Sequence, residues 1–280
     1  MPVGNNFKLE VITEGLVPRE EIRWIVETVN QLYQRAPVPL PPSVELVIID
    51  TSARRRQMMS QEKELLGVDL SEDFPATHEA WWGKPRIIAC LESLKKLSPL
   101  VARASVRVAA AHSILHGSRK HYLFHIPARM VRRGQVWGWE PRLLERLLYL
   151  VASGVKNLAV SRLLVKCGYV AEQAALALEQ LNIEDEEKLL WKMIEDDARG
   201  RALYLAALLR PILFAYPVMP YAPAVAQAVK EVTSHLPAKV GWRLRCLGME
   251  IAQAFTGESS AFVNPAFELV WKRLVEETEP

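Results

Sequence analysis

The sequence predicts an α+β protein that is predominantly helical, with a small N-terminal sheet and a helical C-terminal extension. Short β-branched runs, which are typical of strands, occur only in the first half of the chain. From about residue 140 onward, apolar residues recur at three- and four-residue spacing, which is typical of amphipathic helices. Because strands and helices are segregated along the chain, the pattern favours an α+β fold.

The composition is that of an ordinary globular protein. Of the 280 residues, 50% are apolar and 24% are charged, so a packed core is expected. The net charge of +3 is small and the basic residues are scattered, so we expect no binding to nucleic acid. Prolines interrupt the most apolar stretch, residues 203–229, so we expect no membrane span there.

The cysteines and the N-terminus predict a cytoplasmic protein. Cys90, Cys167 and Cys246 are odd in number and far apart, which indicates neither a disulfide framework nor a cysteine-based zinc site. The first residues lack the basic start and apolar run of a secretory signal.

The first half contains one clear helix and two strands. A helix is expected from Pro18, because proline suits a first helical position, and the proline run from Pro37 should end it. The β-branched run 43–50 and the run 85–94 are expected to be strands. Residues 51–84 are polar and are expected to be irregular.

A central apolar helix should follow. Ser98 is a good N-cap and Pro99 a good first residue, and Gly117 marks the expected end of the helix. Further helices are expected at 140–155, 157–167, 170–181, 185–209, 222–235, 238–255 and 265–277.

Four of the six histidines lie within fourteen residues and form two pairs at i, i+4 spacing: His112 with His116, and His121 with His125. At this spacing on a helix two imidazoles lie about 5–6 Å apart on one face and can reach the same metal ion. The first pair lies on the predicted central helix. The second pair follows Gly117, so its geometry stays open.

The order of these elements resembles a known family. A strand-rich lead that ends in an edge strand, here 87–94, followed by an apolar helix with His112-Ser-Ile-Leu-His116, resembles the minimal core of zincin-type zinc metallopeptidases. The helix in that family reads His-Glu-x-x-His, where both histidines bind zinc and the glutamate activates water. The resemblance covers residues 18–160 and implies zinc as the cofactor, with His112 and His116 as metal ligands.

This chain departs from the family at the catalytic position, because Ser113 replaces the glutamate. A serine hydroxyl is not basic enough near neutral pH to accept a proton from water as a carboxylate does. Ordinary zincin peptidase activity is therefore in doubt even if zinc binds. His78-Glu79 could supply a substitute acid or base, or could simply belong to a loop that the neighbouring tryptophans anchor.

The third metal ligand stays open. Among zincins, a glutamate from a later helix completes one type of site, and we favour Glu145 over Glu140 for this role, with His125 as an outside candidate. Another type uses a third histidine six residues after the second. That position is Tyr122 here and His121 is one residue off, so this pattern fails.

We therefore expect a zincin-like core over residues 1–160 and a helical extension over 161–280. The expected function is that of a zinc-binding, metallopeptidase-like protein that is inactive or altered as a peptidase and contacts a peptide or protein. The alternative is a non-enzymatic helical interaction or scaffold protein with structural histidines, in which the apolar helices between 203 and 255 mediate assembly, including assembly into a homo-oligomer.

Overall fold

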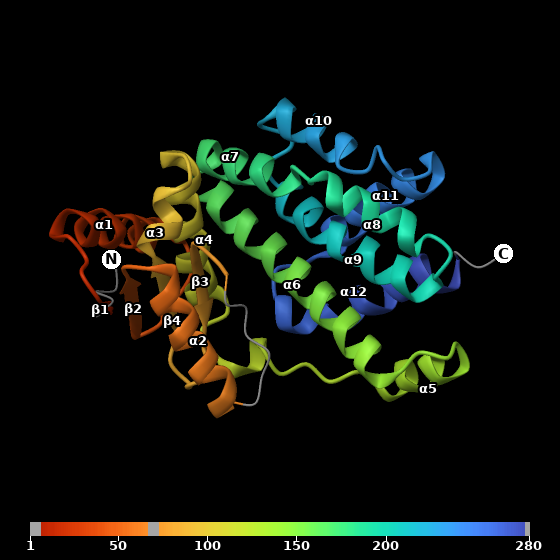
Figure 1. The fold of residues 1–280 in the computed structure, drawn as a ribbon, viewed down its shortest axis with the longest axis horizontal. Helices are drawn as coiled ribbons and strands as arrows, with labels where there is room; N and C mark the ends of the chain where they lie inside the picture. The colour runs from red at the N-terminus through yellow and green to blue at the C-terminus, as the bar shows by residue number, and fades with distance from the viewer. Residues whose placement is uncertain (1–6, 67–72, 278–280) are drawn as a thin grey trace. The chain divides into compact units, whose positions relative to one another are not determined.

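The computed structural model describes residues 7–66 and 73–277 (Figure 1). They form two compact units. The first contains the chain up to Tyr122 together with Lys166–Leu176, and the second contains Leu123–Val165 and the chain from Ala177 onward. These units differ from the two ranges expected from the sequence, 1–160 and 161–280.

The first unit contains a four-stranded mixed sheet. Its strands lie in the order β1 (Lys8–Glu14), β2 (Ser43–Ile49), β4 (Arg86–Cys90) and β3 (Ala76–Glu79). The first three are parallel, and β3 pairs antiparallel with β4 at the edge of the sheet. With helices over most of the remaining described chain, the fold is α+β and predominantly helical, as the sequence predicts.

The strands differ from the expectation in two ways. Only β2 and β4 were predicted, and the second of them ends at Cys90 because Leu91–Lys95 forms the short helix α3. Strand β4 has a neighbour on each side, so the expected edge strand at 87–94 is an interior strand and the edge beside it is β3.

The region expected to be irregular contains a helix, α2 (Ser52–Leu66). Helix α2 buries only Arg55, Met59 and Glu62, so its sequence shows no apolar stripe and periodicity cannot reveal it. Residues 67–72 of the same expected region lie outside the described residues.

The core of the first unit lies on both faces of the sheet. Met59 of α2 packs with Val47 and Ile49 of β2 and with Ile88 of β4. The alternate residues of β2 that point to the other face, such as Leu46, are also fully buried. Helix α1 (Arg19–Arg35), whose start and end agree with the prediction, contacts α4 (Pro99–Leu115), and α4 contacts β3 and β4.

The described part of the second unit is helical. It contains α5 (Ala128–Val136), α6 (Pro141–Lys166) up to Val165, the last turn of α7 (Val170–Leu181), α8 (Asp185–Ile194), α9 (Ala198–Ala215), α10 (Pro223–Glu231), α11 (Ala238–Ala254), α12 (Ser259–Trp271) and a final π-helical turn, Lys272–Glu276. Helix α9 contacts α8, α10 and α11, which are drawn above it in Figure 1. The rings of Trp139 and Trp271 are both buried and lie 5.2 Å apart.

Several helix boundaries in this unit were predicted wrongly. The helix expected at 265–277 begins at Ser259, and Pro265 lies inside it. The two helices expected at 140–155 and 157–167 form the single helix α6. The helix expected at 185–209 is divided, because Asp197 accepts hydrogen bonds from two backbone N–H groups and so caps α9. Helix α9 then continues through Pro211, since the side chains on both sides of the proline are buried and their packing outweighs the lost hydrogen bond.

Helix α6 is long and apolar enough to cross a membrane, with a mean hydropathy of 1.3 over its most apolar window. However, 67% of that window is buried inside the structure. Most of this apolar helix therefore packs against other parts of the protein.

Candidate metal centre

Helix α4 carries the predicted histidine pair on its last turn. The side chain of Ser98 accepts a hydrogen bond from the backbone N–H of Val101, and Pro99 is the first helical residue, so the helix begins as its sequence predicts. At the other end the backbone N–H of His116 donates to the carbonyl oxygen of His112, at 2.7 Å. His116 is the C-cap residue, whose backbone is no longer helical (φ −128°, ψ 24°), and this bond holds it one turn after His112.

The two imidazoles of this pair face each other. Their Nδ1 atoms lie 3.0 Å apart and their ring centroids 5.1 Å apart, and His116 is fully buried. Two nitrogens bound to one tetrahedral zinc, each at 2.0–2.1 Å, would lie about 3.3 Å apart. In the structure the two Nδ1 atoms form a hydrogen bond with each other. Their separation is a few tenths of an ångström shorter than that of a zinc-ligand pair, so a zinc ion bound to both nitrogens would replace the proton that they share.

A third histidine lies beside this pair. The short 3₁₀ helix Arg119–His121 turns the chain back after α4, and it buries His121 with its ring centroid 5.1 Å from that of His116. Arg119 donates to the carbonyl oxygen of Trp81, which ties this turn to the chain segment that follows β3. His121 is one residue away from the position at which one type of zincin has its third histidine, so the sequence pattern did not select it. Only the turn after Gly117 could have indicated that His121 lies beside the pair.

His78 comes to the same place from the edge strand β3. Its ring lies nearly parallel to that of His112, with centroids 6.3 Å apart. The Tyr122 hydroxyl lies 2.7 Å from His78 Nδ1. Burial, with the nearby negative charge of Glu79, raises the pKa of Tyr122, so its hydroxyl stays protonated. Because this contact engages Nδ1, a metal or substrate contact of His78 would use Nε2.

Glu79 does not share this location, although it follows His78 directly. Successive residues of a strand point to opposite faces, and the Glu79 carboxylate accepts a hydrogen bond from Arg86, which also pairs with Glu62 of α2. Burial raises the pKa of Glu79, and Arg86 opposes that effect. The predicted loop around His78 and Glu79 is thus a strand, and of the two side chains only His78 lies beside the histidine pair.

Ser113, at the position where the resembled pattern has glutamate, is buried and hydrogen-bonded within the protein. Its side chain is fully buried, and its hydroxyl donates to the carbonyl oxygen of Ala110 at 2.6 Å. The Ser113 hydroxyl oxygen also lies 2.5 Å from the hydroxyl oxygen of Tyr33 on α1. Both hydrogen bonds direct the Ser113 hydroxyl to protein groups, so it is not available to act on a bound substrate.

The predicted third ligands, Glu145 and Glu140, belong to the second unit, and so does His125. All three are exposed. Glu140 directly precedes α6 and Glu145 lies in its first turns. Their role as ligands stays a prediction. Within residues 7–66 and 73–277, no three His, Cys, Asp or Glu side chains are arranged as a complete metal site.

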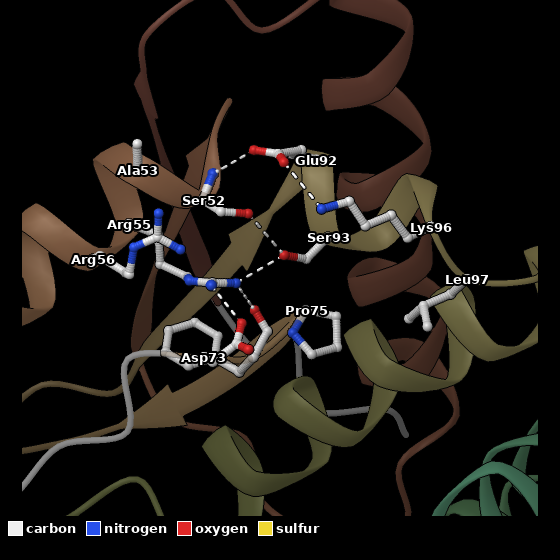
Figure 2. Close-up of a pocket in the computed structure, with 11 residues that line it drawn as sticks. Ser52, Ala53, Arg55, Arg56, Asp73, Pro75, Glu92, Ser93, Lys96 and Leu97 are labelled. Carbon is white, nitrogen blue, oxygen red and sulfur yellow. Dashed lines mark hydrogen bonds and ion pairs between the residues drawn. The ribbon is translucent and has the colours of Figure 1, made fainter.

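A cavity of about 590 Å³ opens elsewhere in the first unit, at the carboxyl ends of β2 and β4 (Figure 2). The buried guanidinium of Arg55 points into it, but it already donates to Phe74 and Ser93 and pairs with Asp73. Glu92 likewise accepts from the Ser52 backbone N–H and from Lys96. Since these charged groups neutralise one another, the histidine cluster is the stronger candidate site.

Comparisons with protein-family models, with curated proteins and with solved structures found no match to this chain.

Proposed function

We propose that this chain is a zinc-binding, metallopeptidase-like protein that lacks ordinary zincin peptidase chemistry. The observation that carries the proposal is the 3.0 Å separation between the Nδ1 atoms of His112 and His116, on the last turn of a buried helix. An antiparallel edge strand, β3, lies against this helix. Edge strands can bind an extended peptide by strand addition, which supports a peptide or protein as the partner.

His112 and His116 would hold the metal through ring nitrogens. Zinc bound there would supply Lewis-acid chemistry. What the chain lacks is a carboxylate at position 113, and the buried Ser113 hydroxyl cannot replace it as a proton acceptor. The protein is therefore either inactive as a peptidase or uses a different chemistry at this site.

A second candidate function is that of a helical interaction protein, which was the alternative expected from the sequence. Trp242 and Met249 of α11 are 60% and 43% exposed. They are seven residues apart and so lie on one face of the helix. Such an apolar face favours contact with a partner protein or a second copy, and this role is compatible with metal binding by the first unit.

We also propose that the protein is cytoplasmic. Its cysteines, Cys90, Cys167 and Cys246, are all unpaired thiols. Unpaired thiols are typical of a reducing compartment.

Elemental analysis of the protein, purified without added metal or chelator, tests the proposed function. We expect near-stoichiometric zinc in the parent protein and its loss in His112→Ala and in His116→Ala, with the exposed His125→Ala as the control that retains it. Circular dichroism of each variant shows whether the fold is retained. A parent protein without zinc, which also takes up none on dialysis against zinc, would overturn the proposal and favour the interaction protein.

A further inference from the structure

We infer that the outer edge of β1 is a dimerisation surface, on which a second copy of this chain adds its own β1 in antiparallel orientation about a two-fold axis at Val11. This contact joins the two four-stranded sheets into one. It lies at the edge of the sheet opposite to β3 and does not depend on metal binding by the histidines.

Strand β1 has an accessible edge. It is the terminal strand of the sheet, and all seven of its residues are at least partly exposed. Val11 and Ile12, two β-branched apolar residues, are each 41% exposed. Soluble proteins usually keep edge strands short, or interrupt them with proline or a bulge, because an open edge pairs with other chains. The sequence of β1 contains no proline or glycine, so it keeps the regular geometry that strand addition needs.

The hydrogen bonds to β2 show which backbone groups of β1 face outward. The Lys8 N–H donates to the carbonyl oxygen of Pro42. At the other end of the strand, the Glu14 carbonyl oxygen accepts from the Asp50 N–H. Alternate residues of a strand bond to the same neighbour, so the even-numbered residues of β1 bond to β2. The N–H and carbonyl groups that point away from the sheet belong to the odd-numbered residues Leu9, Val11 and Thr13.

These three residues are arranged symmetrically about the central one. When two copies pair antiparallel about Val11, that residue lies opposite the partner's Val11, and Leu9 lies opposite the partner's Thr13. The two residues of each such pair exchange two backbone hydrogen bonds. Every outward N–H and carbonyl group of β1 thus gains a bond, in an isologous contact that closes with two copies.

The charged side chains of β1 favour a second copy as the occupant. With the axis at Val11, Lys8 lies opposite the partner's Glu14, and by symmetry Glu14 lies opposite the partner's Lys8. An axis at Glu10 would place that carboxylate opposite the partner's Glu10, and an axis at Ile12 would place it opposite the partner's Glu14. Opposite charges across a strand pair stabilise it and like charges destabilise it, so the charge pattern selects the axis at Val11.

The same arrangement uses side chains on one face of the sheet. Lys8 pairs with Glu10 of its own chain at 2.9 Å, but its side chain is 72% exposed, and such surface pairs contribute little to stability. Lys8 can therefore turn to the partner's Glu14, while Glu10 keeps its ion pair with Lys84.

Ile12 supplies the apolar part of the contact. It lies beside Val47 of β2, on the face of the sheet that packs with Met59 of α2. Across the axis at Val11, Ile12 and the partner's Ile12 are diagonal neighbours, which side chains of this length can bridge. The apolar face of the sheet thus continues from one copy to the other.

Sedimentation equilibrium of the full-length chain over a range of concentrations tests the inference. We expect a mass that approaches twice the 31.7 kDa of one chain. Val11→Pro should stay monomeric, because it removes the N–H at the axis and leaves the hydrogen bonds to β2, which the even-numbered residues make. Trp242→Ala, on α11 of the second unit, is the matched control and should dimerise like the parent.

Exchange of the two charges is a second test that does not depend on a proline. Lys8→Glu and Glu14→Lys each place like charges opposite each other at two symmetric positions, so each should raise the dissociation constant of the dimer by about tenfold. The double variant Lys8→Glu/Glu14→Lys restores opposite charges across the contact, so it should dimerise like the parent.

Circular dichroism of each variant shows whether the fold is retained. A parent that is monomeric at every concentration would overturn the inference. The same holds for a folded Val11→Pro that dimerises like the parent, for a Trp242→Ala that has lost the dimer, and for a double charge variant that dimerises no better than the single ones.

Discussion

The Tyr33 hydroxyl on α1 donates a hydrogen bond to the Ser113 hydroxyl on α4, with 2.5 Å between the oxygens. The direction follows from the proton count, because the single proton of Ser113 goes to the carbonyl oxygen of Ala110. Burial raises the pKa of Tyr33, which keeps its proton in place. Ser113, at the position where the proposed family has its glutamate, therefore joins two helices of the first unit.

Removing this contact should destabilise the fold. Ser113→Ala leaves the buried Tyr33 hydroxyl without its acceptor, so we expect the free energy of unfolding to fall by about 1–3 kcal/mol. Tyr33→Phe should have a similar effect, and the double variant should lose less than the sum of the two. Urea denaturation measures all three. Ser105→Ala is the matched control on α4, since the buried Ser105 hydroxyl donates only within its own helix, to Val101.

A glutamate at position 113, as the proposed family has it, should not create a peptidase. Because residue 113 is fully buried beside Tyr33, Ser113→Glu places a carboxylate in the contact between α1 and α4. We expect a loss of several kcal/mol in stability, as for other buried charges without a partner, and no peptide cleavage. A variant that is as stable as the parent and cleaves a peptide would show that position 113 faces the metal centre.

The buried Arg107 of α4 should contribute strongly to the stability of the first unit. It is 3% exposed, pairs with Glu172 of α7 at 2.6 Å and donates to Thr28 and Gln31 of α1. Arg107→Ala should lower the free energy of unfolding by about 3–5 kcal/mol, because it leaves the Glu172 carboxylate without its buried partner. Thermal or urea denaturation measures this loss. The exposed Arg103→Ala on the same helix should change stability by less than about 0.5 kcal/mol.

Lys156 on α6 should make stability depend on pH in the alkaline range. Burial, with repulsion from Arg210, lowers the pKa of Lys156 from 10.5 to about 8. Between these two values the unfolded chain binds more protons than the folded one, so the free energy of unfolding should rise with pH, by at most about 3 kcal/mol.

Lys156→Met should remove this rise and should be more stable than the parent at pH 7. Urea denaturation at pH 7 and at pH 10 measures both effects, and the difference between parent and variant isolates Lys156 from other groups that titrate there. Lys166→Met, at the exposed end of the same helix, should show the pH profile of the parent. An equal rise with pH in Lys156→Met and the parent would contradict the assignment.

Much of the fold could be predicted because its signals are local. The start of α4 depends on Ser98 and Pro99, and the end of α1 on the prolines that follow it, so a few neighbouring residues suffice. Strand β1 was missed because it is defined by its pairing with β2, which lies beyond α1 in the chain, and β3 because it is only four residues long. Helix α6 was divided in the prediction, whereas it is one helix that buries most of its residues.

The residues of the candidate site also fall into those that the sequence predicts and those that only the tertiary structure reveals. The sequence by itself determined the fold class and the pair His112 and His116, since the spacing of two residues on one helix follows from its periodicity. Only the tertiary structure decided that His121 and His78 lie beside that pair and that Ser113 faces Tyr33. The reason is that a turn, a strand pairing and a helix packing brought these residues together across segments that no local pattern relates.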